Sequence, residues 1–244
     1  MTNHPPMPRT QMTTAIVLAA GAGERFGTKV PKQFIPMAGI PLLVHSLLTF
    51  SASGAIDEIV VVGAGGYLDE IESMVRRYRI EKVTAVVEGG ERRQQSSKIG
   101  VDAASKDTEV LIHDAARPFV SDTLIARTLE AAIEHGAVNP VTSTTNTIVE
   151  IDDEGFITET PDRGGLRGCQ TPQGFRYALI KEAHEYTASR GRFDFTDDSS
   201  LILFMGKPVY TIPSDPYNMK ITHKLDFDIA EALYERLRTD KKGS

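Results

Sequence analysis

The sequence predicts an α/β protein with a mostly parallel, twisted sheet and helices on both faces. Short apolar runs rich in β-branched residues recur along the first half of the chain and do not alternate with polar residues. This pattern is typical of strands that are buried on both faces. Helix-like stretches lie between the runs, and this alternation favours right-handed parallel crossovers. The predicted strands span residues 14–20, 58–62, 83–87 and 109–113.

Helices are predicted after each of these strands, and the last of them has the clearest signals. Ser121 can cap its first turn, and apolar residues recur at helical spacing over 124–133. Gly136 can end the helix in a left-handed conformation. The predicted helices span residues 42–50, 67–78, 94–104 and 121–135.

The pattern changes after Pro140, where two short strands, 147–151 and 156–160, flank a turn at 152–155. An isolated two-stranded ribbon is only marginally stable in water, so we expect a second copy of the chain to cover this arm. The chain then returns to α/β style. The segments expected there are 170–175, helices 178–188 and 197–204, strand 208–212 and a closing helix 225–237.

Composition excludes several classes of protein. The 244 residues carry a net charge of −6, which argues against a broad surface for nucleic acid or an anionic membrane. No apolar run reaches the roughly 18–20 residues of a membrane helix. The only cysteine, Cys169, suits a reducing compartment, so we expect a cytoplasmic protein. We expect one domain over 13–238, with flexible tails at 1–12 and 239–244.

A glycine-rich turn follows the first predicted strand, at the sheet edge where α/β proteins bind ligands. Both the dinucleotide fingerprint and the P-loop would need glycine at position 26, which is Phe26. The turn is therefore either another kind of phosphate-binding loop or a plain tight turn. Arg25 and Lys32 lie close by in sequence, and they are either phosphate-binding cations or solvated charges.

Two further segments end at the same predicted edge. Asp114 closes the fourth strand, where a carboxylate can hold Mg²⁺, and Arg117 follows it. The alternative is a structural pair between these two side chains. Residues 89–97 suit a ribose or a base, or simply form a turn and a capped helix. We expect His113 to be a packed strand residue, and Asp226 and Asp228 to mark a helix start rather than a metal site.

The motifs AAGAGERFG, PKQF, GGERRQQS, HDAARP, QTPQGF and NMKIT occur here in this order. Together they resemble the 2-C-methyl-D-erythritol 4-phosphate cytidylyltransferases of the non-mevalonate isoprenoid pathway, from about Ala15 to Leu233. The resemblance implies a Rossmann-like nucleotidyltransferase fold and transfer of CMP from CTP, with release of pyrophosphate. It also implies Mg²⁺ or another divalent cation, and a homodimer held partly by a β-arm at about 142–166.

The resemblance also implies roles for individual residues. The cytidine nucleotide would contact Ala19, Ala20, Gly21, Gly90, Glu91 and Ser96. The triphosphate and the transition state would be held by Arg25, Lys32 and Lys220. Asp114 would lie beside the metal and the acceptor. The acceptor phosphate would contact Arg117, Thr147 and Thr196, and Arg163 of the neighbouring subunit.

Two alternatives remain open at this point. The segments 136–149 and 168–173 also resemble the ribitol-5-phosphate cytidylyltransferases, a sister group, whereas HDAARP and the segment 162–166 favour the methylerythritol enzymes. The second alternative is a non-catalytic nucleotide-binding protein on the same fold. The presence of the whole set Arg25, Lys32, Asp114, Arg117 and Lys220 argues against it. Nothing in the sequence indicates a role for Cys169.

Overall fold

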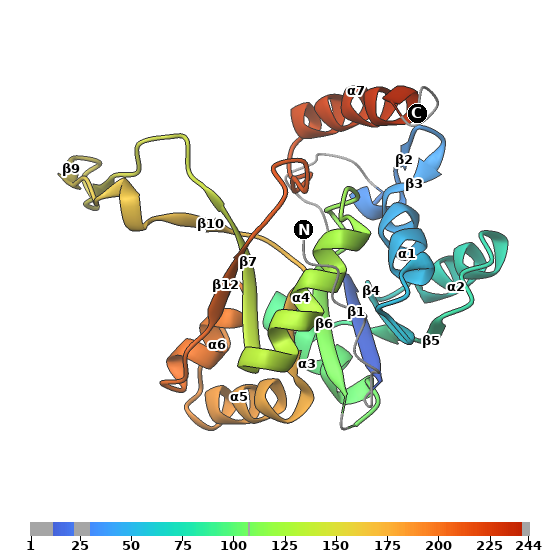
Figure 1. Cartoon of the computed structure of the whole chain (residues 1–244), viewed down its shortest axis with the longest axis horizontal. Helices are drawn as coiled ribbons and strands as arrows, with labels where there is room; N and C mark the ends of the chain where they lie inside the picture. Colours follow the sequence, from blue (N-terminus) through green and yellow to red (C-terminus); the bar gives the residue numbers. More distant parts are fainter. Residues whose placement is uncertain (1–11, 22–29, 107, 241–244) are drawn as a thin grey trace, which may run out of the picture.

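The computed structural model describes residues 12–21, 30–106 and 108–240. Its centre is a mixed sheet in the order β10-β7-β11-β6-β1-β4-β5, with β12 paired to β7 (Figure 1). Strands β1, β4, β5 and β6 are parallel to their neighbours in this group. They span Thr13–Ala19, Glu58–Gly63, Val83–Glu88 and Glu109–Asp114. The four strands predicted from the sequence are therefore confirmed to within one residue at each end.

The other half of the sheet is partly antiparallel. Strand β11 pairs antiparallel with both β6 and β7, β10 pairs antiparallel with β7, and β12 runs parallel to β7. These strands are β7 (Ala137–Ser143), β10 (Arg167–Cys169), β11 (Gln173–Arg176) and β12 (Tyr210–Pro213). The sequence did not predict β7 because Pro140 lies in its middle, and proline usually marks an edge or an end of a strand. Here the backbone of β7 continues through Pro140, whose oxygen accepts from Gln170 N at 2.8 Å.

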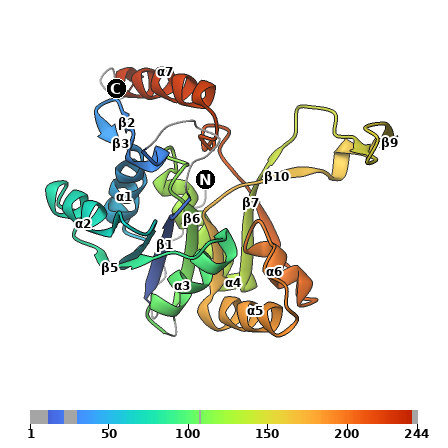
Figure 2. The same cartoon turned by 180° about the vertical axis from the view of Figure 1, so that it is seen from behind.

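Helices cover both faces of the sheet, as predicted, and can be followed from opposite sides in Figures 1 and 2. They are α1 (Leu42–Ala52), α2 (Leu68–Arg77), α3 (Arg93–Ala103), α4 (Asp122–His135), α5 (Tyr177–Ser189), α6 (Ser199–Phe204) and α7 (Lys224–Asp240). Ser121 caps α4 by accepting from Leu124 N at 3.2 Å, and Gly136 ends it with a φ of 81°. Of the described helices, none combines the length and the apolar character that crossing a bilayer requires.

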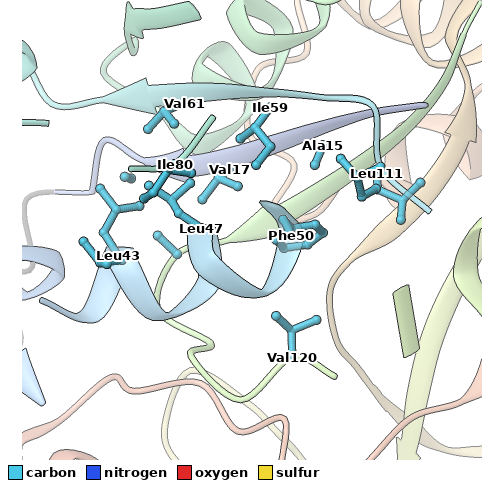
Figure 3. Close-up of a cluster of buried hydrophobic side chains, with 14 of the residues drawn as sticks. Ala15, Val17, Leu43, Leu47, Phe50, Ile59, Val61, Ile80, Leu111 and Val120 are labelled. Carbon is cyan, nitrogen blue, oxygen red and sulfur yellow. The ribbon is translucent and has the colours of Figure 1, made fainter. Parts of the chain in front are cut away.

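Alternate side chains of each central strand enter two separate cores. Ala15 and Val17 of β1 pack with Leu47 and Phe50 of α1 on one face (Figure 3). Ile16 of β1 lies in the opposite core, which α3, α5 and α6 complete. Since consecutive side chains of a strand point to opposite faces, the unbroken apolar runs in the sequence follow directly from this double covering.

An arm leaves the body of the sheet between β7 and β10 (Figure 1). It contains the antiparallel strands β8 (Glu150–Ile151) and β9 (Ile157–Glu159), which are shorter than the sequence predicts. Asp152 closes the turn because its Oδ1 accepts from Glu154 N and Phe156 N at 3.0 and 2.9 Å. Ile151, Phe156 and Ile157 are each about two-thirds exposed, so the arm has little apolar packing of its own.

Glu109, at the start of β6, is a buried acid that the sheet accommodates poorly. The residue is 4% exposed, and no group among the described residues donates to its Oε2. Burial raises the pKa of Glu109 to about 7, although the charge of Arg176 acts in the opposite direction. The ionised form is therefore less stable in the folded chain than in the unfolded chain.

We predict that the wild-type protein loses stability relative to Glu109→Gln as pH rises from about 4.5, the ordinary value of this carboxyl, through about 7. A raised folded-state pKa means that the unfolded chain releases this proton first, so the penalty is absent at low pH and full above the folded pKa. Urea denaturation at pH 4 to 8 should show the difference grow by about 1–3 kcal/mol. Exposed Glu130→Gln is the control, and parallel curves for wild type and Glu109→Gln would contradict the assignment.

Candidate active site

The carboxyl ends of the parallel strands β6, β1, β4 and β5 lie along one edge of the sheet. Ala115 N, just past β6, donates to Leu18 O of β1 at 3.0 Å, and Gly89 N, just past β5, donates to Gly63 O at 2.8 Å. These bonds join the end of β6 to β1 and the end of β5 to β4, and β4 lies between β1 and β5 in the sheet. Segments that are far apart in sequence therefore present their turns side by side, as the parallel arrangement predicts.

The first part of the site is the contact between the turn after β1 and the turn after β5. A Cβ placed on Gly89 would lie only 2.4 Å from Ala20 Cβ and 2.8 Å from Ser96 Oγ. Gly90 N donates to Ser96 Oγ at 3.2 Å. Ala20, Gly90 and Ser96 are thus brought together, and Glu91 is exposed on the same turn.

Gln33 fixes the end of β1 from the other side. This buried side chain lies in the short 3-10 turn Lys32–Phe34 (η2). Its Nε2 donates to Ala19 O at 2.6 Å and to Gly21 O at 3.1 Å. These two hydrogen bonds fix the backbone of the predicted nucleotide loop as far as Gly21. Arg25, the next predicted contact, lies outside the described residues.

Asp114 is the charged centre of this edge. Its Oδ1 accepts from Arg93 Nε at 3.1 Å, and its Oδ2 accepts from Lys220 Nζ at 2.7 Å. Burial alone would raise the pKa of Asp114, but the charges of Arg93 and Lys220 hold it well below the usual value. The carboxylate is therefore ionised at neutral pH, with one oxygen turned to a half-exposed lysine.

Lys32 meets the Lys220 segment from the opposite end of the chain. Its Nζ donates to Ile221 O at 2.6 Å, and Ile221 N donates to Ala116 O at 2.8 Å. Asp226, in the first turn of α7, accepts from Thr222 N and His223 N at 2.7 Å each. Asp226 thus stabilises a helix start, as expected. Lys32, Asp114 and Lys220 lie on one side of the sheet edge.

Arg117 and His113 tie the neighbouring loops together. Arg117 Nη1 donates to Asn218 O at 2.8 Å and its Nη2 to Cys169 O at 3.4 Å. Among the described residues its side chain does not come within ion-pair distance of Asp114, although burial lowers the pKa of Arg117 and the Asp114 charge acts in the opposite direction. His113 is fully buried against Arg117 O and Thr171 Oγ1, and burial lowers its pKa to about 4. It is a neutral packed residue, as the sequence predicts.

Three predicted acceptor contacts are not gathered around Asp114 in this way. Thr147 and Arg163 are exposed on the arm, which leads away from the sheet (Figure 1). Arg163 Nη1 donates to Thr145 O at 3.5 Å, within the arm itself. Thr196 is exposed in the loop that precedes α6.

Sequence reasoning missed two charged residues beside Asp114. Arg93 bridges Asp114 and Asp198, with Nη1 donating to Asp198 Oδ2 at 2.8 Å. Burial alone would lower the pKa of Arg93, but the charges of Asp198 and Asp114 outweigh burial and raise this pKa above its ordinary value. Arg93 stands beside Arg92, and Asp198 beside Asp197. The sequence carries no signal that separates the buried member of each pair from the exposed one.

The fold and this edge, where cations surround an ionised carboxylate beside a glycine turn, are those of an α/β nucleotidyltransferase. The chain belongs to the 2-C-methyl-D-erythritol 4-phosphate cytidylyltransferase family (IspD), whose family model matches residues 13–236. The resemblance stated from the motifs is confirmed over nearly the whole chain.

Relatives and solved structures agree with this assignment. The chain is 41% identical over 219 residues to the 2-C-methyl-D-erythritol 4-phosphate cytidylyltransferase of Geobacillus thermodenitrificans, covering 90% of this chain and 95% of that protein. It matches the crystal structure of 4-diphosphocytidyl-2C-methyl-D-erythritol synthase from Anaerococcus prevotii with a TM-score of 0.82 and 31% identity, covering 92% and 96% of the two chains. The Thermus thermophilus enzyme matches with a TM-score of 0.75 and 34% identity, covering 90% and 98%.

We predict that Gly89→Ala weakens CTP binding about tenfold or more, since its Cβ would push the β5 turn off Ala20 and Ser96. Isothermal titration with CTP measures the effect. Gly54→Ala is the matched control, because a Cβ there meets nothing within 4 Å. Equal affinity of the Gly89→Ala and Gly54→Ala variants would show that this close approach does not shape the nucleotide site.

Proposed function

We propose that this chain transfers CMP from CTP to 2-C-methyl-D-erythritol 4-phosphate and releases pyrophosphate. The observation that supports this most strongly is the family match over residues 13–236, together with relatives of that activity at about 40% identity. The same match favours methylerythritol phosphate over ribitol 5-phosphate as the acceptor. The lone Cys169 is consistent with action in the reducing cytoplasm.

In the proposed reaction an oxygen of the acceptor phosphate attacks the α-phosphorus of CTP. The bond from that phosphorus to the bridging oxygen breaks, and its electron pair leaves with pyrophosphate. The attacking oxygen is already ionised, so no general base has to remove a proton. This agrees with the state of His113, the histidine next to Asp114 in sequence, which is buried and neutral. Catalysis then consists of positioning and charge stabilisation.

Binding of the nucleotide is assigned to the two turns that meet at Gly89. Backbone groups of the first turn and the start of α3 would hold the cytidine nucleotide, and the positive end of the helix favours an anion there. The residues assigned are Ala19, Ala20, Gly21, Gly90, Glu91 and Ser96.

Arg25, Lys32 and Lys220 would hold the phosphates. Lys220 is the clearest case, since its side chain is 39% exposed and its ammonium pairs with Asp114. An incoming triphosphate can compete with Asp114 for this lysine, because the Lys220 side chain remains partly exposed to solvent. Lys32 lies beside the same segment through Ile221 O, so both cations can act on one bound triphosphate.

Asp114 fits a site for Mg²⁺. Magnesium in nucleotide enzymes is commonly held by one or two carboxylates, phosphate oxygens and water. Asp114 supplies one ionised carboxylate at the phosphate edge, and the described residues contain no cluster of three or more acidic, histidine or cysteine ligands. When bound, the metal would neutralise phosphate charge. Asp114 would hold it and also lie beside the acceptor.

The acceptor phosphate is assigned to Arg117, Thr147 and Thr196, with Arg163 supplied by a second copy of the chain. Arg163 and Thr147 lie on the arm, whose apolar side chains are largely exposed. A homodimer formed through the arm would cover those side chains and bring Arg163 to the partner's site. We therefore propose that the active protein is a homodimer.

The deciding experiment is a pyrophosphate-release assay with CTP, Mg²⁺ and either 2-C-methyl-D-erythritol 4-phosphate or ribitol 5-phosphate. We expect a kcat/KM at least about 100-fold higher with methylerythritol phosphate, because a site built for one polar acceptor leaves its groups unpaired with another. Preference for ribitol 5-phosphate would overturn the acceptor assignment. CTP binding without turnover on either acceptor would favour the non-catalytic alternative.

Lys32→Ala should lower kcat by about 10²–10³-fold, the usual cost of removing one donor that stabilises transition-state charge. Steady-state kinetics at saturating CTP measure this loss. Lys98→Ala is the control, since Lys98 is a partly exposed lysine of α3 that pairs with Asp102. Turnover of Lys32→Ala within a few-fold of wild type would rule out the assigned role.

A further inference from the structure

A buried charge network lies behind Asp114, on the side away from Lys220. Asp198 is fully buried at the start of α6, and both of its carboxylate oxygens are engaged. Its Oδ2 accepts from Arg93 Nη1 at 2.8 Å, and its Oδ1 accepts from Ser97 Oγ at 2.5 Å. Ser97 Oγ also lies 3.3 Å from His184 Nε2 of α5. The network joins α3, α5 and α6 to the end of β6.

Arg93 is held in this network only by its two carboxylates. Nε donates to Asp114 and Nη1 to Asp198, while Nη2 is buried without a partner among the described residues. A buried guanidinium that loses one of two charge partners pays a large desolvation cost and moves towards water. The position of Arg93 on Asp114 therefore depends on Asp198.

The backbone of Asp198 is itself firmly placed. Gln173 Oε1, from β11, accepts from Asp198 N at 2.9 Å and from Ser199 N at 3.3 Å. Gln173 is 1% exposed, so this anchor belongs to the sheet rather than to a surface loop. The path from the sheet through Asp198 and Arg93 to Asp114 is continuous, and only Arg93 on it is partly exposed.

We propose that Asp198 is a positioning residue for the transfer reaction. By fixing Arg93 it holds Asp114 Oδ1, which leaves Oδ2 directed towards Lys220 and the reacting phosphates. Asp198 touches no substrate itself. The inference rests on the proposed activity, and it adds Arg93 and Asp198 to the residues that the reaction needs.

Asp198→Asn keeps the shape of the side chain but removes the charge that holds Arg93. We expect kcat/KM for methylerythritol phosphate to fall about 10–100-fold, the usual effect of losing such a supporting contact. The dissociation constant for CTP should change less than about threefold, because the nucleotide turn is held by its own bonds between Gly90 and Ser96. Ser97→Ala is the matched control, since it removes the contact to the other oxygen of the same carboxylate.

A double-mutant cycle decides whether Asp198 acts through Arg93. In an Arg93→Gln background, adding Asp198→Asn should change kcat/KM by less than about threefold. If the two residues acted independently, the double variant would lose kcat/KM by the product of the two single losses. Two separate losses that multiply, or a single Asp198→Asn variant with kcat/KM within about threefold of wild type, would overturn the proposal. If Asp198→Asn alone fails to fold, the double variant removes both charges together and is compared with Arg93→Gln.

A crystal structure of Asp198→Asn gives a readout that does not depend on activity. We expect the contact of 3.1 Å between Arg93 Nε and Asp114 Oδ1 to be broken. An unchanged contact would overturn the proposal. A wild-type protein without transfer activity would refute the proposed function. The crystal structure of Asp198→Asn would still test whether Asp198 holds Arg93 on Asp114.

Discussion

The site depends on one constraint, which is that a buried carboxylate at the end of a central strand needs positive partners. Asp114 obtains them from Arg93 and Lys220, which lie 21 and 106 residues away in sequence. A buried ion pair is weak evidence for stability, because desolvation consumes much of the attraction. Its consequence here is geometric. The pairing brings the turn after β5 and the segment before α7 to the end of β6, and Lys32 reaches the same segment through Ile221 O.

The parallel half of the fold could be predicted because its signals are local. Strands covered on both faces give continuous apolar runs, and α4 carries its own cap and stop at Ser121 and Gly136. Strand β7 could not be predicted, because Pro140 interrupts the local pattern and the pairing with β10, β11 and β12 comes from distant segments. Tertiary pairing outweighs local propensity in that half of the sheet.

The site, like the fold, has one part that the sequence predicts and another part that only tertiary packing sets. Parallel topology alone predicts that one edge of the sheet holds the glycine turn, the turn at Gly90 and Asp114. The same topology does not predict which of two adjacent like charges turns inward. Both pairs lie where a loop enters a helix, with Arg92 as the N-cap of α3 and Asp198 as the N-cap of α6, so helical periodicity does not set their directions. Arg92 lies on the surface near Phe193 O, whereas Arg93 joins two carboxylates. Asp197 binds Ser200 at the start of α6, and Asp198 faces the interior.

The proposed acceptor site and the proposed homodimer both depend on the arm. Its two strands are too short to be stable by themselves, and they expose Ile151, Phe156 and Ile157. Arg163 lies on this arm, so it can serve an active site only if the arm reaches a second chain. The role proposed for Arg163 therefore requires the proposed homodimer. Asp114 has its partners inside one chain and is independent of both proposals. Under them, a monomer would keep the ion pairs of Asp114 and lose Arg163 from the proposed acceptor site.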